Sequence, residues 1–439
     1  MVIFDVLGIG FGPANIAVAA ANEELGSNLR MHFFEKNKTS SWQAGMQFGQ
    51  SDIQNHPLRD LVTPRNPRSK YSFTNFLHTK GRLFEFLNLG RIFPLRTEYS
   101  QYVEWVAGHF ADSVSYETEV KSIECLHVDG KPIYKVVTSN DSVHFGRSII
   151  VAPGRTAYIP MPFAGLSAPN VIHLNQFIPT LNRMRQEQAL QKIAVIGSSQ
   201  SAVEIMLHLA GELPDAELYG FSRSFGYRMK DVSPFTGEVY FPEFVDTYYA
   251  CSSEQKRALN RDLRFTNYSA TDADMLDALY LKMYQEKIGG HERIFIVRSS
   301  TITDASLLEN GKVSISYSSV ESPLTQNEFD LVILATGFKN LGPNPDEERF
   351  PVILTSLVDF AVKDEDGVLK INKDYSLEMN ANSEEMAPCY LNGLCESSHG
   401  MGDAGSFSIL SLRSEIIVKS LSERLAAQAS ACATELALA

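Results

Sequence analysis

The first residues with a recognisable chemical use are glycines at alternate positions near the start of the chain: Gly8, Gly10 and Gly12, followed by Pro13. They follow the apolar segment 2–7, which predicts a buried parallel strand that ends in a tight turn. Gly10 would let the backbone approach a pyrophosphate closely. Pro13 stands where a third glycine is usual, and it suits the first position of a helix whose free N–H groups could hold a phosphate.

A carboxylate ends the next apolar segment, 31–35. This residue, Glu35, lies about 20 residues beyond the glycine turn, the spacing at which an acid binds the hydroxyls of a ribose. Strand, glycines, helix and acid together predict a dinucleotide site. The alternative is a tight turn in an ordinary α/β domain.

The same pattern recurs after the apolar segment 192–196, where Gly197 is followed by Ser199, Gln200 and Ser201. Ser199 replaces the second glycine, so a hydroxymethyl group must fit beside the phosphates. The next strand ends near Arg223 without an acid, which favours a 2′-phosphate and therefore NADPH over NADH. The alternative for this arginine is an ordinary surface cation.

Two such turns on one chain predict two cofactors, because hydride passes between a nicotinamide and an acceptor held nearby. A flavin can accept a hydride and then react with oxygen, so we expect FAD at the first turn and NADPH at the second. We expect a third strand over residues 329–337, which ends in the small residues Ala335, Thr336 and Gly337.

These turns must be positioned by parallel sheets whose strands alternate with helices. We therefore expect an α/β protein with two Rossmann-like dinucleotide-binding domains, for FAD and for NADPH, plus a small, mainly helical substrate region. We expect helices near 98–110 and from about Phe407 towards Leu425. The expected divisions are an FAD domain in two parts (1–165 and 326–425), an NADPH domain between them (166–325, with the helical insertion at about 231–290) and a C-terminal tail (426–439).

Composition narrows the function. The chain has 439 residues and a net charge of -13, which argues against a nucleic-acid surface. No apolar run reaches the length of a membrane span, and the N-terminus lacks the basic start of a signal peptide, so we expect a cytoplasmic protein. The five cysteines are scattered and never in C-x-x-C spacing, which excludes a simple redox dithiol and a clustered-cysteine zinc site; we expect no metal.

At this point the sequence resembles the microbial flavin-dependent N-hydroxylating monooxygenases, the L-ornithine and L-lysine N-monooxygenases of siderophore pathways. The resemblance runs through nearly the whole chain and is more specific than either glycine turn. The matching residues are Gly8 to Pro13, Trp42, Gln54, Asp60-Leu61-Val62, Asn66-Pro67, Tyr71-Ser72-Phe73, Gly197, Gln200-Ser201, Ser233-Pro234-Phe235, Asn267-Tyr268, Ala335-Thr336-Gly337 and His399-Gly400.

The resemblance implies that NADPH reduces FAD, that O2 gives a C4a-hydroperoxyflavin, and that a neutral primary amine takes its distal oxygen. It also implies a homo-oligomer, a dimer or tetramer. The site residues that it implies are Gln54 and Asn267 around flavin, nicotinamide and substrate, and Trp42, Gln200, Ser201, Thr336, Gly337, His399 and Gly400 for the cofactors. The protein would position groups, exclude water and keep the amine deprotonated.

The chain departs from this family at substrate-facing positions. Arg59 stands where the ornithine enzymes have a lysine that binds the substrate carboxylate, and Gly237 replaces an asparagine that makes a second contact. Arg264 lies three residues before Asn267. Our hypothesis is that an acidic group is still bound, by Arg59 and with Arg264 as a second candidate, so that another amino acid such as aspartate is hydroxylated. A plain diamine is less expected, since it would leave Arg59 unpaired.

Other classes share the two-nucleotide plan. A Baeyer–Villiger monooxygenase would carry F-x-G-x-x-x-H, but His173 falls eight residues after Gly165. A flavin disulfide reductase needs a paired-cysteine motif that is missing. A flavin oxidase and a non-enzymatic flavin-binding sensor stay open, and amine-dependent NADPH consumption would separate these possibilities.

Overall fold

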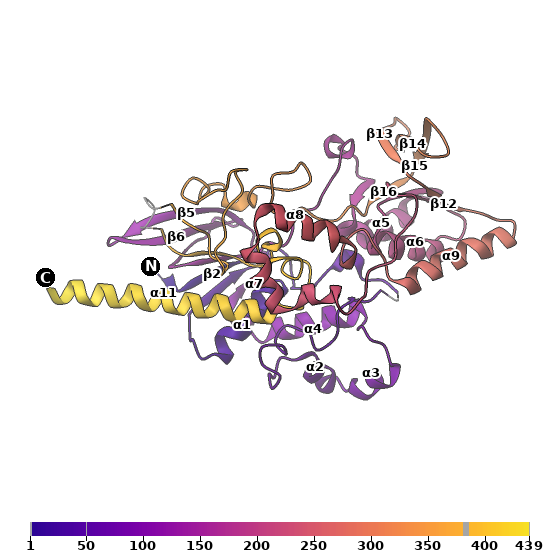
Figure 1. Ribbon diagram of the computed structural model, residues 1–439. Coiled ribbons are helices and arrows are strands. Elements are labelled where there is room, and N and C mark those ends of the chain that lie inside the picture. Colours follow the sequence, from indigo (N-terminus) through magenta and orange to yellow (C-terminus); the bar gives the residue numbers. More distant parts are fainter. Residues whose placement is uncertain (1, 50, 381–385, 439) are drawn as a thin grey trace.

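Two parallel sheets of five strands each form the centres of two α/β halves that lie side by side (Figure 1). The computed structural model describes residues 2–49, 51–380 and 386–438, with the side chains of the last helix described as far as residue 428. We call the part built on the first sheet the first half and the part built on the second sheet the second half.

The first sheet has the strand order β17-β8-β2-β3-β4, with every pair parallel. Most of its residues are buried, as Val6 and Leu7 are, because helices cover both faces of a parallel sheet. The bounds are β2 Val6–Ile9, β3 Met31–Phe34, β4 Val114–Ser115, β8 Ile149–Val151 and β17 Cys389–Leu391. The helices of this half are α1 Pro13–Glu24, α2 Phe73–Thr79, α3 Leu83–Leu89, α4 Arg96–Gly108 and α11 Leu410–Leu438, of which α1 packs on α11.

The second sheet has the order β12-β11-β10-β16-β9, again all parallel. Its bounds are β9 Val171–His173, β10 Lys192–Ile196, β11 Glu217–Phe221, β12 Ile294–Val297 and β16 Leu331–Leu334. The helices α5 Phe177–Glu187, α6 Gln200–Glu212 and α9 Ala273–Ile288 accompany it. In each sheet the strand order reverses beside the strand that carries a glycine turn, which confirms the expected α/β class with two Rossmann-like units.

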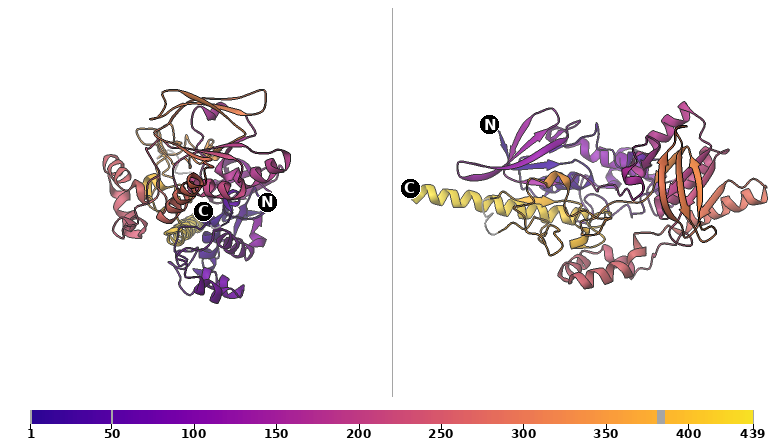
Figure 2. Two further views of the ribbon diagram at one scale, coloured as in Figure 1. Left: turned by 90° about the vertical axis from the view of Figure 1, so that its right-hand side faces the viewer. Right: turned by 90° about the horizontal axis from the view of Figure 1, so that it is seen from above.

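Each half also has a small antiparallel or mixed sheet. In the first half the order is β1-β7-β6-β5, and in the second half it is β13-β14-β15. The bounds are β1 Ile3–Phe4, β5 Val120–Val128, β6 Lys131–Thr138, β7 Val143–Gly146, β13 Thr301–Leu307, β14 Val313–Ser318 and β15 Thr325–Phe329. The helices α7 Pro242–Ala250 and α8 Ser253–Asp262 lie outside both main sheets (Figure 2), and α7 packs on α10 Glu396–His399.

The chain crosses between the halves twice, and the two crossing segments pair with each other. Tyr158 N donates to Gly337 O (3.0 Å), and Lys339 N donates to Thr156 O (2.8 Å). The first segment follows β8 and the second follows β16. The second half is therefore an insertion whose two ends lie together.

The elements differ from the expected ones in three places. The helix expected near 98–110 begins at Arg96 and ends at Gly108. The helix expected from Phe407 begins at Leu410 and runs to Leu438, so the expected division between 425 and 426 falls inside α11. All of α9 lies within the expected helical insertion, but this helix packs on α6 and so accompanies the second sheet.

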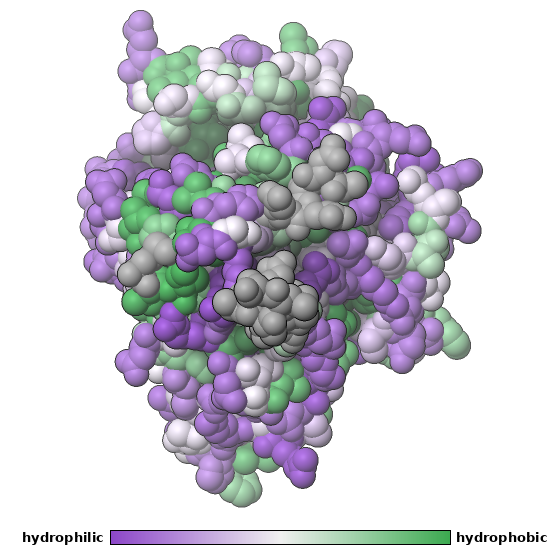
Figure 3. All heavy atoms as spheres, turned by 90° about the vertical axis from the view of Figure 1, so that its left-hand side faces the viewer, coloured by the Kyte–Doolittle hydropathy of each residue, from purple (hydrophilic) through white to green (hydrophobic). Residues whose placement is uncertain are grey.

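The surface at the end from which α11 extends is largely hydrophilic. Figure 3 shows hydrophilic residues over much of the end from which α11 extends, with hydrophobic residues in smaller groups between them. Over the described part of the chain, no helix combines the length and the apolar character needed to span a membrane.

Candidate functional site

The first glycine turn presents bare backbone at the start of α1. Gly10 has φ +83°, and a Cβ added to it would lie 2.3 Å from the carbonyl oxygen of Ala152. Gly12 is the N-cap of α1, and nothing lies within 4 Å of a Cβ added there. The first N–H groups of a helix have no partner within the helix. The turn therefore leaves open space at a helix N-terminus, which fits the pyrophosphate of a dinucleotide.

Glu35 lies directly behind this turn and is buried. Its Oε2 accepts from Phe11 N (2.9 Å), and its Oε1 accepts from Asn37 N (2.9 Å) and Asn37 Nδ2 (2.7 Å). The carboxylate thus also fixes the turn itself. Because two carboxylate oxygens offer about four lone-pair positions, Glu35 keeps capacity for a ribose hydroxyl.

At the second turn, as at Gly10 in the first, the backbone lies too close to a neighbouring segment to leave room for a side chain. A Cβ added to Gly197 would lie 2.3 Å from Ala335 O, and Thr336 and Gly337 follow at once, with the Thr336 hydroxyl donating to Tyr158 O. Ser199 is the N-cap of α6 and is followed by Gln200 and Ser201. This arrangement places the two turns after β10 and β16 against each other.

Basic side chains lie at the edge of the second sheet where β11 and β12 end. Arg223 is exposed just after β11, and Arg298, which follows β12, donates to Phe225 O (3.1 Å). Ser299 N donates to Ser224 O (3.0 Å), so the two loops pair. Each of the two paired loops thus carries an arginine, a residue type that suits the 2′-phosphate of NADPH.

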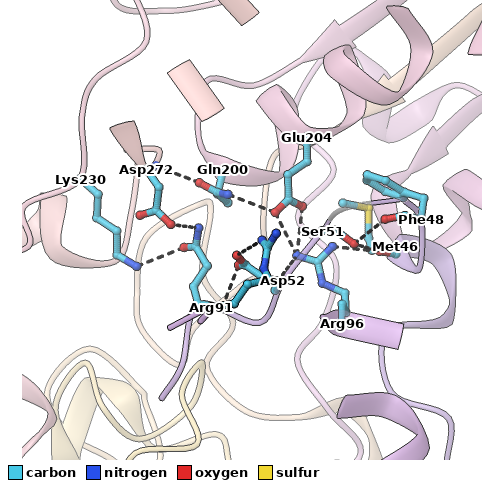
Figure 4. Close-up of polar contacts among 11 residues, drawn as sticks. Met46, Phe48, Ser51, Asp52, Arg91, Arg96, Gln200, Glu204, Lys230 and Asp272 are labelled. Atoms are coloured by element: carbon cyan, nitrogen blue, oxygen red, sulfur yellow. Dashed lines mark hydrogen bonds and ion pairs between the residues drawn. The ribbon is translucent and has the colours of Figure 1, made fainter. Parts of the chain in front are cut away.

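Gln54 belongs to the first half but is held by two residues of the second, Lys230 and Asp272, which are both labelled in Figure 4. Its Oε1 accepts from Lys230 Nζ (3.1 Å), and its Nε2 donates to Asp272 Oδ2. The backbone N–H of Asp272 in turn donates to Gln200 Oε1 (3.0 Å). Gln54 has φ +50°, a left-handed conformation that is uncommon for a residue other than glycine. The amide is therefore fixed at the boundary between the halves.

Lys230 also lines an open pocket of ≈ 620 Å³ beside this amide. The pocket walls come from the segment after the second turn and from one aromatic ring: Arg228, Met229, Lys230, Asp231, Val232, Ser233 and Phe265. All of these residues belong to the second half, so the pocket lies on that half, next to the Lys230 side chain that donates to Gln54.

A buried ion pair continues the contact between the halves. Arg96 Nη2 lies 3.1 Å and 3.0 Å from the two carboxylate oxygens of Glu204 on α6, and it also donates to Asp52 O (2.9 Å). Glu204 accepts from Gln200 Nε2 as well (3.1 Å). Burial raises the pKa of Glu204, and the charge of Arg96 opposes that rise. The pair anchors the first turn of α6 to α4.

Arg59 points towards the loop that precedes α11. Its Nη1 donates to Ser408 Oγ (3.3 Å), and its own carbonyl accepts from Asn55 Nδ2 (2.6 Å). The neighbouring Asp60 is completely buried, and its carboxylate accepts from backbone N–H groups on both sides, including Phe73 N (2.7 Å). The loop that carries Arg59 is thus held rigidly, while its guanidinium stays half-buried.

A second arginine, Arg155, lies on the first crossing segment and contacts the second. Its Nη2 donates to Asn340 Oδ1 (2.6 Å), whose Nδ2 donates to Glu396 Oε1 (3.0 Å). Tyr268 OH donates to the other oxygen of Glu396 (2.5 Å). Burial raises the pKa of Glu396, and the charge of Arg155 lowers it. Sequence reasoning missed Arg155, although it directly follows the small-residue turn at 152–154.

Three further residues were expected near the substrate: Asn267, Arg264 and Gly237. Asn267 lies beside Arg155, and both side chains face the position where Gly405 would carry a Cβ. Arg264 is exposed and donates to Ser269 Oγ (2.9 Å), so the structure does not bring it to Arg59. Gly237 lies in a 3-10 turn with nothing within 4 Å of an added Cβ.

Two expected residues pack in the surrounding structure. Trp42 meets Phe407 edge to face (ring centroids 5.1 Å), which joins the first half to the loop before α11. His399 is buried and stacks on Tyr375 (4.1 Å), and a Cβ added to Gly400 would lie 3.0 Å from Phe244 on α7.

Sequence reasoning also missed Arg96, Glu204 and Asp272. The one available signal was the i,i+4 spacing of Gln200 and Glu204, which puts both on one face of α6. Across residues 2–49, 51–380 and 386–438, no cluster of three or more His, Cys, Asp or Glu side chains could hold a metal ion.

Comparison with known proteins gives consistent matches. A family model described as L-lysine 6-monooxygenase/L-ornithine 5-monooxygenase matches residues 2–340. An L-ornithine N(5)-monooxygenase of Burkholderia cepacia is 33% identical over 410 residues, which cover 91% of this chain and 90% of that protein. The reduced form of the ornithine hydroxylase of Pseudomonas aeruginosa superposes with a TM-score of 0.88 at 31% identity, covering 97% of this chain and 100% of that chain. An ornithine N-hydroxylase of Kutzneria sp. 744, with reduced FAD, NADP⁺ and L-ornithine, gives a TM-score of 0.87 at 31% identity and covers 96% and 100%.

Proposed function

This chain belongs to the L-lysine 6-monooxygenase/L-ornithine 5-monooxygenase family, and on that premise we propose that it hydroxylates the primary amine of a small, ornithine-like amino acid. The reaction uses FAD, NADPH and O2. One oxygen atom of O2 joins the amine nitrogen to give a hydroxylamine, the other leaves as water, and NADPH supplies the two electrons. Such a product serves siderophore assembly or another N-hydroxylated natural product.

The observation that carries this proposal is the position of the Gln54 amide. It comes from the first half, and residues beside the second glycine turn hold it at both ends. A flavin and a nicotinamide must meet face to face for hydride transfer, and the boundary between two nucleotide units is where they can do so.

We assign the cofactors to the two turns. The open space at Gly12 and the start of α1 would hold the pyrophosphate of FAD, with Glu35 on its ribose. The turn at Gly197 to Ser201 would hold NADPH, with Arg223 on the 2′-phosphate. Bound FAD, once reduced by NADPH, supplies an activated oxygen atom, so the protein needs no nucleophile or metal of its own.

The residues of the chain then bind and orient. Gln54 uses one donor and one acceptor for protein partners, which leaves the other N–H and lone pair of its amide for a cofactor ring or the amine. The Asn267 amide forms no hydrogen bond with the described residues, so it is available to the substrate. Arg59 would bind a carboxylate, and the Trp42–Phe407 contact would help to keep water out.

We also propose the finer assignments that the sequence suggested. Residues 1–165 and 326–425 would form the FAD domain and 166–325 the NADPH domain, although the second sheet includes β16 and the chain returns to the first half only after that strand. A homo-oligomer, dimer or tetramer, would cover the exposed apolar face of α9 that includes Tyr280, Tyr284 and Ile288. A cytoplasmic location would supply NADPH.

The proposal is tested with the purified chain loaded with FAD. NADPH and O2 consumption and hydroxylamine formation are measured with L-ornithine, L-lysine, other amino acids and short diamines. We expect hydroxylamine in step with NADPH for at least one amino acid. Consumption of NADPH that yields only peroxide, whatever the amine, would show an oxidase instead.

A further inference from the structure

Three polar groups converge on a position that no side chain fills. A Cβ added to Gly405 would lie 3.4 Å from Arg155 Nη1, 3.6 Å from Asn267 Nδ2 and 3.8 Å from Tyr268 OH. Gly405 itself is exposed, so this position opens to the outside of the chain. A guanidinium and an amide N–H around an open point form a binding place for an anion.

Arg155 forms no direct ion pair with any described residue, although its charge and that of Glu396 act on each other at longer range. Its Nη2 donates to the neutral Asn340 and to Phe338 O (3.5 Å), and its Nε has no hydrogen-bond partner within the described chain. The acid that comes nearest in this cluster, Glu396, is linked to it through Asn340 and Tyr268. Because Nη2 is already engaged, Nη1 is the guanidinium nitrogen that would donate to a carboxylate at the open position, beside the Asn267 side-chain amide.

Arg59 provides a second cation, which reaches the same loop from the segment that precedes Asp60. Among the described residues it also forms no ion pair, and its Nη1 donates to Ser408 Oγ (3.3 Å). Ser408 is three residues beyond Gly405, so the two loop positions lie no more than about 11 Å apart. The two guanidiniums therefore reach the same short stretch of one loop, where a small dicarboxylic molecule would find a cation for each carboxylate.

We propose that the preferred substrate is a short dicarboxylic amino acid, with one carboxylate on Arg59 and the other on Arg155 and Asn267. The inference rests on the proposed N-monooxygenase function and names its substrate class. An amino acid with one carboxylate would leave one of the two guanidiniums unpaired, and a diamine would be repelled by both. Arg155 thereby takes the role for which Arg264 was considered, because Arg264 is exposed and bonded to Ser269.

The test compares L-aspartate and L-glutamate with L-ornithine and L-lysine on the FAD-loaded full chain. We expect kcat/KM for a dicarboxylic amino acid to exceed that for ornithine. The Arg155→Met variant keeps the aliphatic stem, and it should raise KM for the dicarboxylic substrate about 10- to 100-fold, since a charge-assisted hydrogen bond is lost. Arg155→Lys, which keeps the charge, should restore part of the loss. Arg264→Met is the matched control and should change nothing.

Binding is measured separately from turnover with succinate, a dicarboxylate without an amine. Succinate should compete with the substrate in the wild type and lose this effect in Arg155→Met. A further variant leaves Arg155 in place: Gly405→Asp puts a carboxylate of the chain itself next to Nη1 and should abolish succinate binding. Gly405→Ala adds only the Cβ and should retain most of it. Flavin content and thermal melting establish that each variant is folded.

The outcomes separate the two claims. The inference would be overturned if the protein hydroxylates ornithine efficiently and if Arg155→Met changes neither the turnover of dicarboxylic amino acids nor the binding of succinate. The proposed function would still stand in that case. An equal effect of Arg264→Met would also overturn it. Absence of hydroxylamine from every amine would refute the proposed function, while loss of succinate binding in both Arg155→Met and Gly405→Asp would still establish the anion site.

Discussion

At the scale of single residues, the most informative side chain is the amide of Gln54. Lys230 and Asp272 hold its oxygen and nitrogen, and a left-handed backbone aims it at the boundary of the halves. In Gln54→Ala both charged partners lose a hydrogen bond, which costs about 1.5–3 kcal/mol. We expect kcat for hydroxylation to fall about 10-fold or more, with less hydroxylamine per NADPH.

Gln101→Ala is the control for this prediction, because Gln101 is an exposed glutamine on α4. Product and NADPH should be counted in the same reaction. Unchanged coupling in Gln54→Ala would remove this amide from the site.

Substitutions of Gly10 and Gly12 in the first turn separate an effect on folding from an effect on FAD binding. A Cβ at Gly10 would collide with Ala152 O, and a residue other than glycine is strained at φ +83°. Gly10→Ala should therefore lower the melting temperature of the flavin-free protein. A Cβ at Gly12 meets nothing within 4 Å, so Gly12→Ala should leave that melting temperature unchanged. Gly12→Ala should instead weaken FAD retention, because the Cβ occupies the space that we assign to the pyrophosphate.

Calorimetry of the flavin-free protein and flavin absorbance after gel filtration measure the two effects. If Gly12→Ala keeps its full flavin content, the open space at the start of α1 is not where the pyrophosphate lies.

At the scale of elements, the contact between α4 and α6 depends on the buried pair Arg96–Glu204, whose side chains are 7% and 1% exposed. Arg96→Met leaves Glu204 charged and buried, which should lower the free energy of unfolding by about 3–5 kcal/mol. The double variant Arg96→Met/Glu204→Leu removes both charges and should be more stable than either single variant. Urea unfolding measures all three.

The exposed pair Arg183–Glu187 on α5 is the control, since Arg183→Met should cost about 0.5 kcal/mol or less. A double variant that loses as much stability as the two single variants summed would show that the two charges are not coupled. Even when it is stable, the double variant should bind NADPH less well, because Gln200 loses its anchor on Glu204.

Local patterns explain which elements could be predicted from the sequence. A strand, a glycine turn and a helix follow one another within about 25 residues, and the physical requirements of the turn act on those residues alone. The end of α11 was placed too early because apolar periodicity fades after Leu425 while the backbone hydrogen bonds of the helix continue to Leu438.

At the scale of the whole molecule, buried histidines should make stability sensitive to mild acid. Burial lowers the pKa of five described histidines: His32, His144, His173, His208 and His399. Below the unfolded value of 6.5 the unfolded chain takes up protons that the folded chain does not. Their contribution to stability is therefore present above pH 6.5 and is lost as the pH falls.

The variant His173→Gln isolates one such group, because His173 is buried and its Nε2 lies 2.9 Å from Gly337 O. Its free energy of unfolding should vary less steeply between about pH 7.5 and 5.5, by at most about 1.4 kcal/mol per pH unit. Buried carboxyls with a raised pKa, such as Glu204, act in the opposite sense. The difference from the wild type is thus the quantity to measure, with the exposed His78→Gln as control.

Only part of the candidate site could be predicted from the sequence. Residues inside the glycine motifs could be assigned, since the chemistry and the spacing are local. Arg155 contacts Asn340, 185 residues away, and its role depends on two crossing segments that meet only in the fold. Arg264 was favoured because it is near Asn267 in the sequence, yet its side chain turns to Ser269 at the surface.

The pairing of the two crossing segments also makes the second half an exchangeable cassette. Its entry at Tyr158 and its exit at Gly337 are joined by a hydrogen bond of 3.0 Å, so a related unit could be grafted there without stretching the chain. Such a graft would change nucleotide preference while Arg59 and Arg155 stay with the recipient. The grafted unit would also need an acidic residue at the position of Glu204, because Arg96 of the recipient pairs with that residue across the boundary. Enzymes of this kind can therefore be recombined only when this ion pair is kept.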